Sequence, residues 1–264
     1  MDAIEYPELP EELQVSRSEG VLSLTLNRPA KLNTVTPEMG KALMSLVQVI
    51  NLDDEVRVVV LQGKGERAFS AGSDVSVLDS YGNNWELRNR VDYARAIWAI
   101  RKPVIAKIRG YCIGGGLEMA LMSDIRVAVP GASFGAGEIK LGWHGGAGNT
   151  QLLPRVLSSG KALQMLLTGD LMAAAEARAD GLVDELKDED EIDAYVSELA
   201  ARIAANAPIA AQLAKHLVRV AQSTSLEVGL AYENDTFAYC FTTQDSAEGR
   251  AAFLEKRSPE FQGR

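Results

Sequence analysis

The chain has 264 residues, of which 47% are hydrophobic and 24% are charged, a composition typical of globular proteins. This length allows one large domain or a core with an appendage, and either can bury a substantial apolar interior. The formal net charge is −9 and the pI is about 4.9, which argues against a surface for nucleic acid or anionic membranes. Cys112 and Cys240 are too few for a disulfide framework, and no Cys/His cluster suggests a metal site.

The N-terminal residues are acidic and interrupted by Pro7 and Pro10, whereas a signal peptide carries basic and then apolar residues. No apolar run approaches the ~20 residues that cross a bilayer. We therefore expect a cytoplasmic protein that binds neither membranes nor nucleic acids.

The first half of the chain alternates predicted strands with predicted helices, which indicates an α/β fold with a parallel sheet and right-handed crossovers. Thr36 and Pro37 form an N-cap and N1 pair, which predicts a helix to about Asp53. The spacing of apolar residues predicts a second helix over Trp85–Ile100. The predicted strands are Val21–Leu26, Val56–Leu61, Val104–Ile108 and Ile125–Val129.

From Ala147 onward the chain is predicted to be almost wholly helical. The expected helices cover 147–157, 160–167, 173–180, 189–206, 208–222, 225–242 and 244–256. No fixed-period repeat is visible, so a solenoid of identical units is not supported. The sequence leaves open whether the helical C-terminal third packs on the core of its own chain or on another subunit.

The stretch from Lys102 to Ala120 carries the strongest functional signal. It is interpreted as a buried strand, a triple-glycine turn over Gly114–Gly116 and the first turn of a helix that contains Glu118. Three successive glycines have a high entropy cost, so we expect them to bring bare peptide N–H groups beside a ligand. The helix adds unpaired N–H groups and the positive end of its dipole. Developing negative charge could be stabilised there, next to an acid or base.

Two other segments are candidates for the same site. Ala68–Asp74 follows the predicted strand 56–61, and it is either a turn capped by Asp74 or a second backbone N–H donor. Two such turns could form a two-donor oxyanion hole. Glu138 lies in a glycine-flanked loop downstream of Glu118. Both glutamates are surface residues by default, but in one apolar pocket their pKa values would be driven apart, so that one acts as acid and the other as base.

Two further groups have both a functional and an ordinary structural interpretation. Trp143 and His144 form either a pocket wall or a plain loop, and no serine or cysteine elbow supports a hydrolase triad that includes His144. Arg28 and Lys31, together with Lys256 near the C-terminus, are surface charges by default and phosphate ligands if the substrate is polyanionic.

Taken in chain order, these motifs resemble the crotonase (enoyl-CoA hydratase/isomerase) superfamily. The resemblance implies a crotonase-like spiral of ββα units, with an acyl-CoA site in a core over residues 1–200 and a helical trimerisation region over 201–264. It also implies an acyl-CoA thioester substrate, a homotrimer or dimer of trimers, and no cofactor or metal, because coenzyme A is part of the substrate. The matching segments are Asn27–Asn33, Ala68–Asp74, Lys102–Ala106, Gly110–Gly116, Ser123–Ile125, Phe134–Gly135, Leu167–Asp170, Ala179–Val183 and Phe253–Arg257.

The resemblance also implies roles for individual residues. The N–H groups of Ser73 and Gly115 would form the oxyanion hole, Glu118 would help to activate water for attack at Cβ, and Glu138 would deliver or remove the proton at Cα. In hydratases a proline often stands where this chain has Gly145, so the acyl specificity is expected to depend on this loop. The remaining residues implied at the substrate are Ala71, Asp74, Trp143, His144, Gly146, Arg28, Lys31 and Lys256.

The presence of both glutamates favours reversible hydration of a trans-2-enoyl-CoA to a 3-hydroxyacyl-CoA. The nearest alternative is another crotonase reaction, either enoyl-CoA isomerisation or dehydration of a specialised hydroxyacyl-CoA. An RNA-binding protein is disfavoured by the acidic balance and the lack of a basic stripe, and a hydrolase that uses His144 is the third alternative. The acyl chain length, the stereochemistry and the choice between trimer and hexamer are left open by the sequence.

Overall fold

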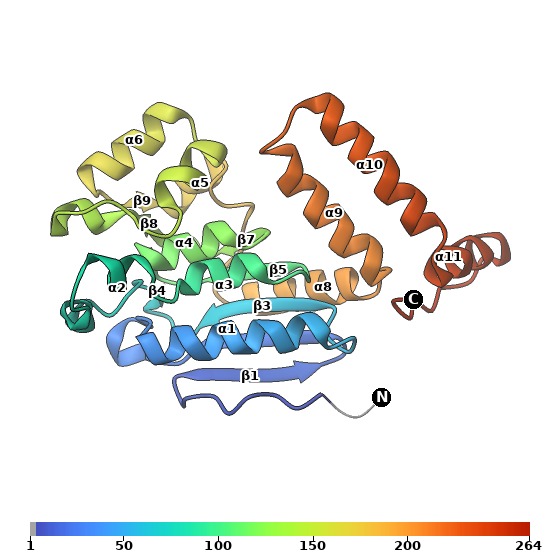
Figure 1. The fold of residues 1–264 in the computed structure, drawn as a ribbon, viewed down its shortest axis with the longest axis horizontal. Helices are drawn as coiled ribbons and strands as arrows, with labels where there is room; N and C mark the ends of the chain where they lie inside the picture. Colours follow the sequence, from blue (N-terminus) through green and yellow to red (C-terminus); the bar gives the residue numbers. More distant parts are fainter. Residues whose placement is uncertain (1–3) are drawn as a thin grey trace.

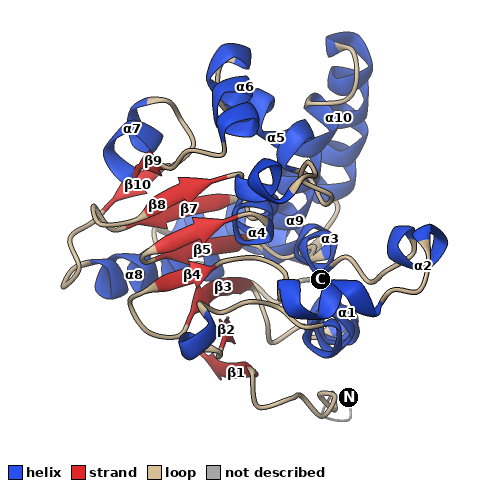
Figure 2. Ribbon diagram, turned by 90° about the vertical axis from the view of Figure 1, so that its left-hand side faces the viewer, coloured by secondary structure: helices blue, strands red, loops and turns tan. Residues whose placement is uncertain are grey.

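The structure is a computed structural model that describes residues 4–264. Its larger sheet has six strands in the order β1-β2-β3-β5-β7-β10 (Figures 1 and 2). Only β1 and β2 pair antiparallel, and the other pairs are parallel, as the alternating pattern predicts. The strands are β1 Leu13–Ser18, β2 Val21–Leu26, β3 Val58–Gly63, β5 Val104–Ile108, β7 Ile125–Ala128 and β10 Glu185–Leu186.

A second, smaller sheet has the strand order β4-β6-β8-β9. Each of its first three strands follows directly after a strand of the larger sheet, as β4 follows β3, β6 follows β5 and β8 follows β7. Because β4, β6 and β8 pair in parallel, the chain leaves all three at the same edge. The three segments that follow these strands therefore meet. The strands are β4 Ala68–Ser70, β6 Tyr111–Ile113, β8 Ser133–Gly135 and β9 Met172–Ala173.

The helices of the first half agree with the sequence patterns except in one place. The first helix begins after Thr36, whose side chain accepts a hydrogen bond from the Met39 N–H, as the capping pattern predicts. The single helix predicted over Trp85–Ile100 is wrong, because Asn89 ends one short helix and Asp92 caps the next. Short polar side chains compete for backbone groups in this way and interrupt helices. The helices are α1 Pro37–Leu52, α2 Asn84–Arg88, α3 Tyr93–Ala99 and α4 Gly115–Met122.

The second half is helical, as predicted, apart from the two-residue strands β9 and β10. Short 3₁₀-helices occur in the connections of the described residues, namely η1 Pro29–Lys31, η2 Val75–Ser80 and η3 Gly137–Leu141. No helix within residues 4–264 is both long enough and apolar enough to cross a membrane. The helices are α5 Asn149–Val156, α6 Ser159–Thr168, α7 Ala174–Ala179, α8 Ile192–Ala204, α9 Pro208–Ala221, α10 Leu226–Phe241 and α11 Gln244–Glu255.

The core lies between the larger sheet and the helices on it. Helix α8 packs against β2, β3, β5 and β7, while α1, α3 and α4 pack in succession. Strand β3 is buried on both faces over Val58–Leu61, as expected of a central parallel strand. Helices α9, α10 and α11 extend away from the sheets (Figure 1). The expected division of the chain at residue 200 stays a prediction.

Helix α9 is anchored to the core by one carboxylate. Asp124 accepts from Lys215 Nζ at 2.6 Å and from an Arg219 nitrogen at 3.1 Å. The Arg219 guanidinium also lies over the Trp98 ring, at 3.8 Å from its centroid. Because both cations are largely buried, each needs this partner to offset the loss of hydration.

Candidate active site

The two small-residue turns predicted to act together lie against each other. A Cβ atom on Gly72 would lie 2.6 Å from the Gly115 nitrogen. The Ser73 turn is held by Val35, which donates its N–H to the Gly72 carbonyl at 2.8 Å and accepts from the Asp74 N–H at 3.0 Å. The Ser73 N–H lies between these two bonds and takes part in neither. Gly115 is the first residue of α4, so its N–H is outside the helical ladder. Two peptide donors are thus adjacent.

Close packing explains why this turn has glycines. Gly114 has a φ of +57°, which favours glycine over other residues. A Cβ on Gly115 would lie 1.9 Å from the Tyr93 hydroxyl oxygen, and one on Gly116 would lie 2.0 Å from the Ser70 carbonyl oxygen. Neither position therefore accommodates a side chain without moving its neighbours.

Glu118 is buried one helical turn into α4, with an exposed fraction of 4%. Its Oε1 accepts from the backbone N–H of Ala147 at 2.7 Å and from that of Asn149 at 3.3 Å. Burial raises the pKa of the Glu118 carboxyl to about 7, although the two N–H donors oppose the shift, and the charge of Glu138 adds to it. A carboxyl with this pKa can give or take a proton near neutral pH.

Glu138 lies on η3 and faces the same turns. Its Oε1 accepts from the Asn149 side-chain amide at 3.0 Å, and a Cβ on Gly114 would lie 3.6 Å from the same oxygen. Its Oε2 is buried and has no hydrogen-bond partner among the described residues. A buried acceptor of this kind needs a proton or a ligand donor. The structure therefore brings together Ser73, Gly115, Glu118 and Glu138 with Asn149, and we call these five residues the two-glutamate site.

Two residues of this region were missed by the sequence analysis. The Tyr93 hydroxyl hydrogen bonds with the Ser73 hydroxyl at 2.9 Å, and burial raises the pKa of the Tyr93 phenol above its ordinary value, so the phenol stays protonated. Asn149 contacts both glutamates. Neither residue belongs to a recognisable motif, because Tyr93 looks like an apolar helix residue and Asn149 like an ordinary start of a helix.

The loop after Glu138 carries the residues proposed as a pocket wall. Trp143 is 42% exposed, and His144 is also exposed, with its Nδ1 at 2.7 Å from the Gly145 carbonyl oxygen. Gly146 accepts from Arg90 at 3.4 Å. Within residues 4–264 no serine or cysteine side chain hydrogen bonds with His144, which gives the hydrolase alternative no support.

Arg28 and Asp74, two of the predicted substrate ligands, already bind other groups of the protein. Arg28 donates to the Thr34 carbonyl at 2.9 Å and pairs with Asp74 at 3.0 Å. Asp74 caps η2 by accepting from Ser76, and hydrogen bonds from Ser76 lower the pKa of the Asp74 carboxyl. The capping interpretation of Asp74 is thus confirmed, and Arg28 is largely occupied by Asp74.

The remaining predicted ligands of the substrate are Ala71, Lys31 and Lys256. Ala71 is held by its N–H on the Leu32 carbonyl at 2.9 Å, while Lys31 is exposed in η1. Lys256 follows α11, which lies apart from α4 (Figure 1). The resemblance implies that such a lysine often comes from a neighbouring subunit, and the contact of Lys256 with the substrate stays a prediction. In the described part of the chain no cluster of three or more potential metal ligands occurs.

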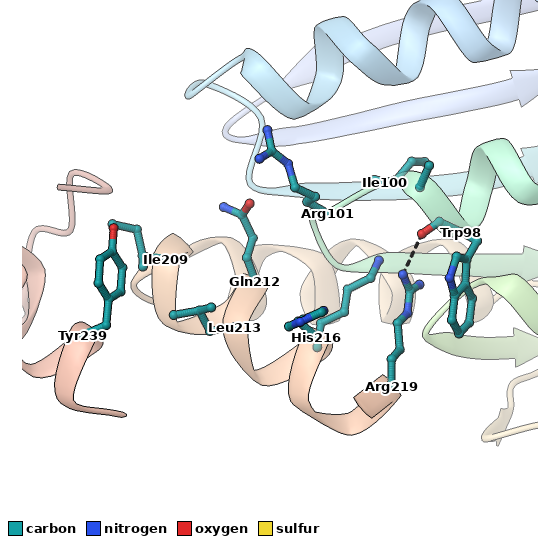
Figure 3. A pocket seen from close by; sticks show the side chains of 11 residues that line it. Trp98, Ile100, Arg101, Ile209, Gln212, Leu213, His216, Arg219 and Tyr239 are labelled. Atoms are coloured by element: carbon teal, nitrogen blue, oxygen red, sulfur yellow. Dashed lines mark hydrogen bonds between the residues drawn. The ribbon is translucent and has the colours of Figure 1, made fainter. Parts of the chain in front are cut away.

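A separate cavity of about 370 Å³ lies between α3 and α9 (Figure 3). Its lining includes Arg101, Lys215, His216 and Arg219. Lys215 and Arg219 already hydrogen bond with groups of the protein. Arg219 donates to the Trp98 carbonyl at 2.6 Å, the bond drawn in Figure 3, and Lys215 donates to the Lys102 carbonyl at 2.7 Å. This cavity therefore belongs to the attachment of α9, and it contains none of the residues of the two-glutamate site.

Comparison with known proteins gives the same family along nearly the whole chain. The family model described as enoyl-CoA hydratase/isomerase matches residues 16–264. The chain is 38% identical to a 2,3-dehydroadipyl-CoA hydratase of Escherichia coli (strain K12), over 96% of this chain and 99% of that protein. It is 34% identical to a crotonyl-CoA hydratase of Syntrophomonas wolfei, over 95% and 98% of the two chains.

The fold comparison agrees with the sequence comparison. The crystal structure of an enoyl-CoA hydratase from Bacillus anthracis superposes with a TM-score of 0.90 at 34% identity, and the match covers 96% of this chain and all 100% of that one. A putative enoyl-CoA hydratase from Streptomyces coelicolor gives a TM-score of 0.91 at 35% identity. The crotonase-like fold predicted from the motifs is thus confirmed, and the chain belongs to the enoyl-CoA hydratase/isomerase family.

Proposed function

We propose that this protein is an enoyl-CoA hydratase that reversibly adds water to a trans-2-enoyl-CoA and forms a 3-hydroxyacyl-CoA. The observation that carries the proposal is the meeting of two carboxyl groups, Glu118 and Glu138, beside two peptide donors, Ser73 and Gly115. Hydration needs the functions that these groups can supply, namely a base for water, an acid for Cα and a site for the enolate oxygen. The family and the names of the relatives support the same reaction.

In this mechanism the thioester carbonyl oxygen accepts hydrogen bonds from the Ser73 and Gly115 N–H groups. When water adds at Cβ, the electron pair of the double bond moves toward the carbonyl, and negative charge develops on its oxygen. Donors that are already in position stabilise this charge more than they stabilise the neutral carbonyl, so they lower the barrier. The positive end of the α4 dipole acts in the same direction.

The two glutamates then handle the protons. The Glu118 carboxylate removes a proton from the attacking water, whose oxygen bonds to Cβ, and Glu138 delivers a proton to Cα. Glu118 ends protonated and Glu138 ends ionised, so one proton returns to Glu138 before the next turnover. The unpartnered Oε2 of Glu138 supports its assignment as the proton donor, because a proton there satisfies a group that otherwise lacks a donor.

The proposal includes no metal or redox cofactor, because hydration changes no oxidation state overall and the electrophilic role is taken by the N–H groups. Coenzyme A enters as part of the substrate, with Lys31 and Lys256 as proposed phosphate contacts. Trp143 and His144, in the loop after Glu138, are the proposed wall of the acyl site. The relatives named above act on different acyl groups, so this proposal leaves the acyl group open. Residence in the cytoplasm stays a prediction.

We also infer that the protein is a homotrimer or a dimer of trimers. Helices α10 and α11 carry large exposed apolar side chains, among them Phe237, Phe253 and Leu254, which are 63%, 83% and 79% exposed. Apolar patches of this kind are typical of protein–protein interfaces. Sedimentation equilibrium should give three or six times the chain mass of 28.5 kDa. A single species at the chain mass would contradict the inference.

Glutamine substitutions test the reaction assignment. Glu118→Gln and Glu138→Gln keep the shape of each side chain but remove its acid–base function, so each should lower hydration by ~10²–10⁴-fold. The assay follows loss of the conjugated enoyl thioester absorbance across a panel of enoyl-CoAs. An isomerase would lose its activity mainly with one of the two changes. If the unmodified protein hydrates no member of the panel, the hydratase assignment is wrong.

The pH dependence tests the role of Glu118. Its carboxyl should titrate near pH 7 in the folded protein, against 4.5 for an ordinary glutamate, and Glu138→Gln should lower this pKa by removing a like charge. As the folded state binds the proton more tightly, the free energy of unfolding should decrease as the pH rises from about 4.5 to about 7. Titration by ¹³C NMR, with signals assigned through Glu118→Gln, measures the shift. A midpoint near the ordinary value would refute the role of burial.

An alanine at Gly72 tests the oxyanion hole. The new Cβ would lie 2.6 Å from the Gly115 nitrogen, at a φ of +86° that disfavours a side chain. Displacement of one donor should lower kcat by ~10²–10³-fold. Gly131→Ala is the matched control, because nothing lies within 4 Å of its Cβ position. Equal activity of the two variants would show that the contact between the turns does not matter.

A further inference from the structure

Asn149 is completely buried and is hydrogen bonded to both glutamates of the two-glutamate site and to Gly114. Its side-chain NH₂ donates to Glu138 Oε1 at 3.0 Å and to the Gly114 carbonyl at 3.2 Å. Its backbone N–H donates to Glu118 Oε1 at 3.3 Å. Both side-chain partners are acceptors, so the orientation of the amide follows from the hydrogen bonds. One residue therefore connects both glutamates with the turn that precedes Gly115.

The amide oxygen of Asn149 has no partner. Asn149 Oδ1 and Glu138 Oε2 are the two buried side-chain acceptors without a hydrogen bond in residues 4–264. An amide that only filled space would lose free energy by leaving a buried oxygen unsatisfied. Two unsatisfied acceptors on side chains that hydrogen bond with each other indicate a place for a proton on Glu138 and for a hydrogen-bond donor that comes with the reactants.

Gly145 packs against Asn149 and has no room for a side chain. A Cβ on Gly145 would lie 2.9 Å from the Asn149 Cβ and 3.1 Å from Glu118 Oε1. The Asn149 Cβ is fixed by the backbone of α5, so it cannot swing away as the end of a long side chain can. A side chain at position 145 and the amide at position 149 therefore exclude each other.

We propose that Asn149 is a positioning residue that holds Glu138 in place relative to Glu118 and the Gly115 turn, and that Gly145 makes room for it. The free amide oxygen is then available to accept a hydrogen bond from the attacking water or from the hydroxyl of the product. This inference rests on the proposed hydration, and it adds a residue that does not itself exchange protons with the reactants.

Substitution of Asn149 tests the proposal. Asn149→Asp keeps the shape but replaces the NH₂ donor by an oxygen, and Asn149→Gly removes the side chain while keeping the backbone N–H to Glu118. Each should lower kcat by ~10-fold or more and change KM by less than about threefold, whereas a general loss of structure would change both. Gln151→Ala, at an exposed position of the same helix, is the control and should change none of these quantities.

A double-mutant cycle tests the link to Gly145. Gly145→Ala alone should lower both the Tm and kcat, because the new methyl group collides with Asn149. In the Asn149→Gly background the same change should have a clearly smaller effect on the Tm. If Gly145→Ala lowers the Tm equally in both backgrounds, a side chain at position 145 does not collide with Asn149, and this part of the proposal is wrong.

Two results separate this inference from the proposed function. If the unmodified protein hydrates no enoyl-CoA, the proposed function fails, but the Tm cycle needs no turnover and still tests the contact between Gly145 and Asn149. If the protein is a hydratase but neither Asn149 variant lowers kcat with KM little changed, the positioning role is overturned.

Discussion

The site depends on the parallel pairing of three short strands, β4, β6 and β8. Each strand continues from a strand of the larger sheet, and their pairing brings three chain segments out at one edge. The first segment supplies the Ser73 N–H, the second supplies Gly115 and Glu118, and the third supplies Glu138. Because the backbone ladder fixes this arrangement, two donors and two carboxyl groups from distant parts of the sequence become neighbours.

Close backbone contact at this edge determines which residues the turns can contain. Gly72 and Gly115 nearly touch, and Gly115 also lies against the Tyr93 hydroxyl. These contacts leave no room for side chains on the turns, so no side chain of the turns themselves stands beside the peptide N–H groups. The same close packing surrounds Glu118 with protein, and burial is the main cause of its raised pKa. The close approach of the two turns and the raised pKa of Glu118 thus have a common origin in how tightly the strands and α4 pack.

Asn149 links the two glutamates, because it hydrogen bonds with both of their carboxyl groups. The polar contacts around them are few, and each is specific: two backbone N–H groups on Glu118, one side-chain amide on Glu138 and one contact of that amide with Gly114. In a buried setting such hydrogen bonds are stronger than in water, and unsatisfied groups are costly. The two acceptors that stay unsatisfied are therefore the atoms that a proton or a donor from the reactants would satisfy.

The sequence by itself determined the local elements, the family resemblance and the pair of glutamates. Strands β2 and β5 were predicted at their observed bounds, and Thr36 and Pro208 start helices as their capping patterns require, because these signals act within a few residues of the chain. Only the tertiary structure decided that α2 and α3 are separate, that Tyr93 and Asn149 lie at the site, and that Gly145 lies against Asn149. Their roles depend on which atoms meet across the β4-β6-β8 edge, and contacts between distant segments leave no periodicity or spacing in a single sequence.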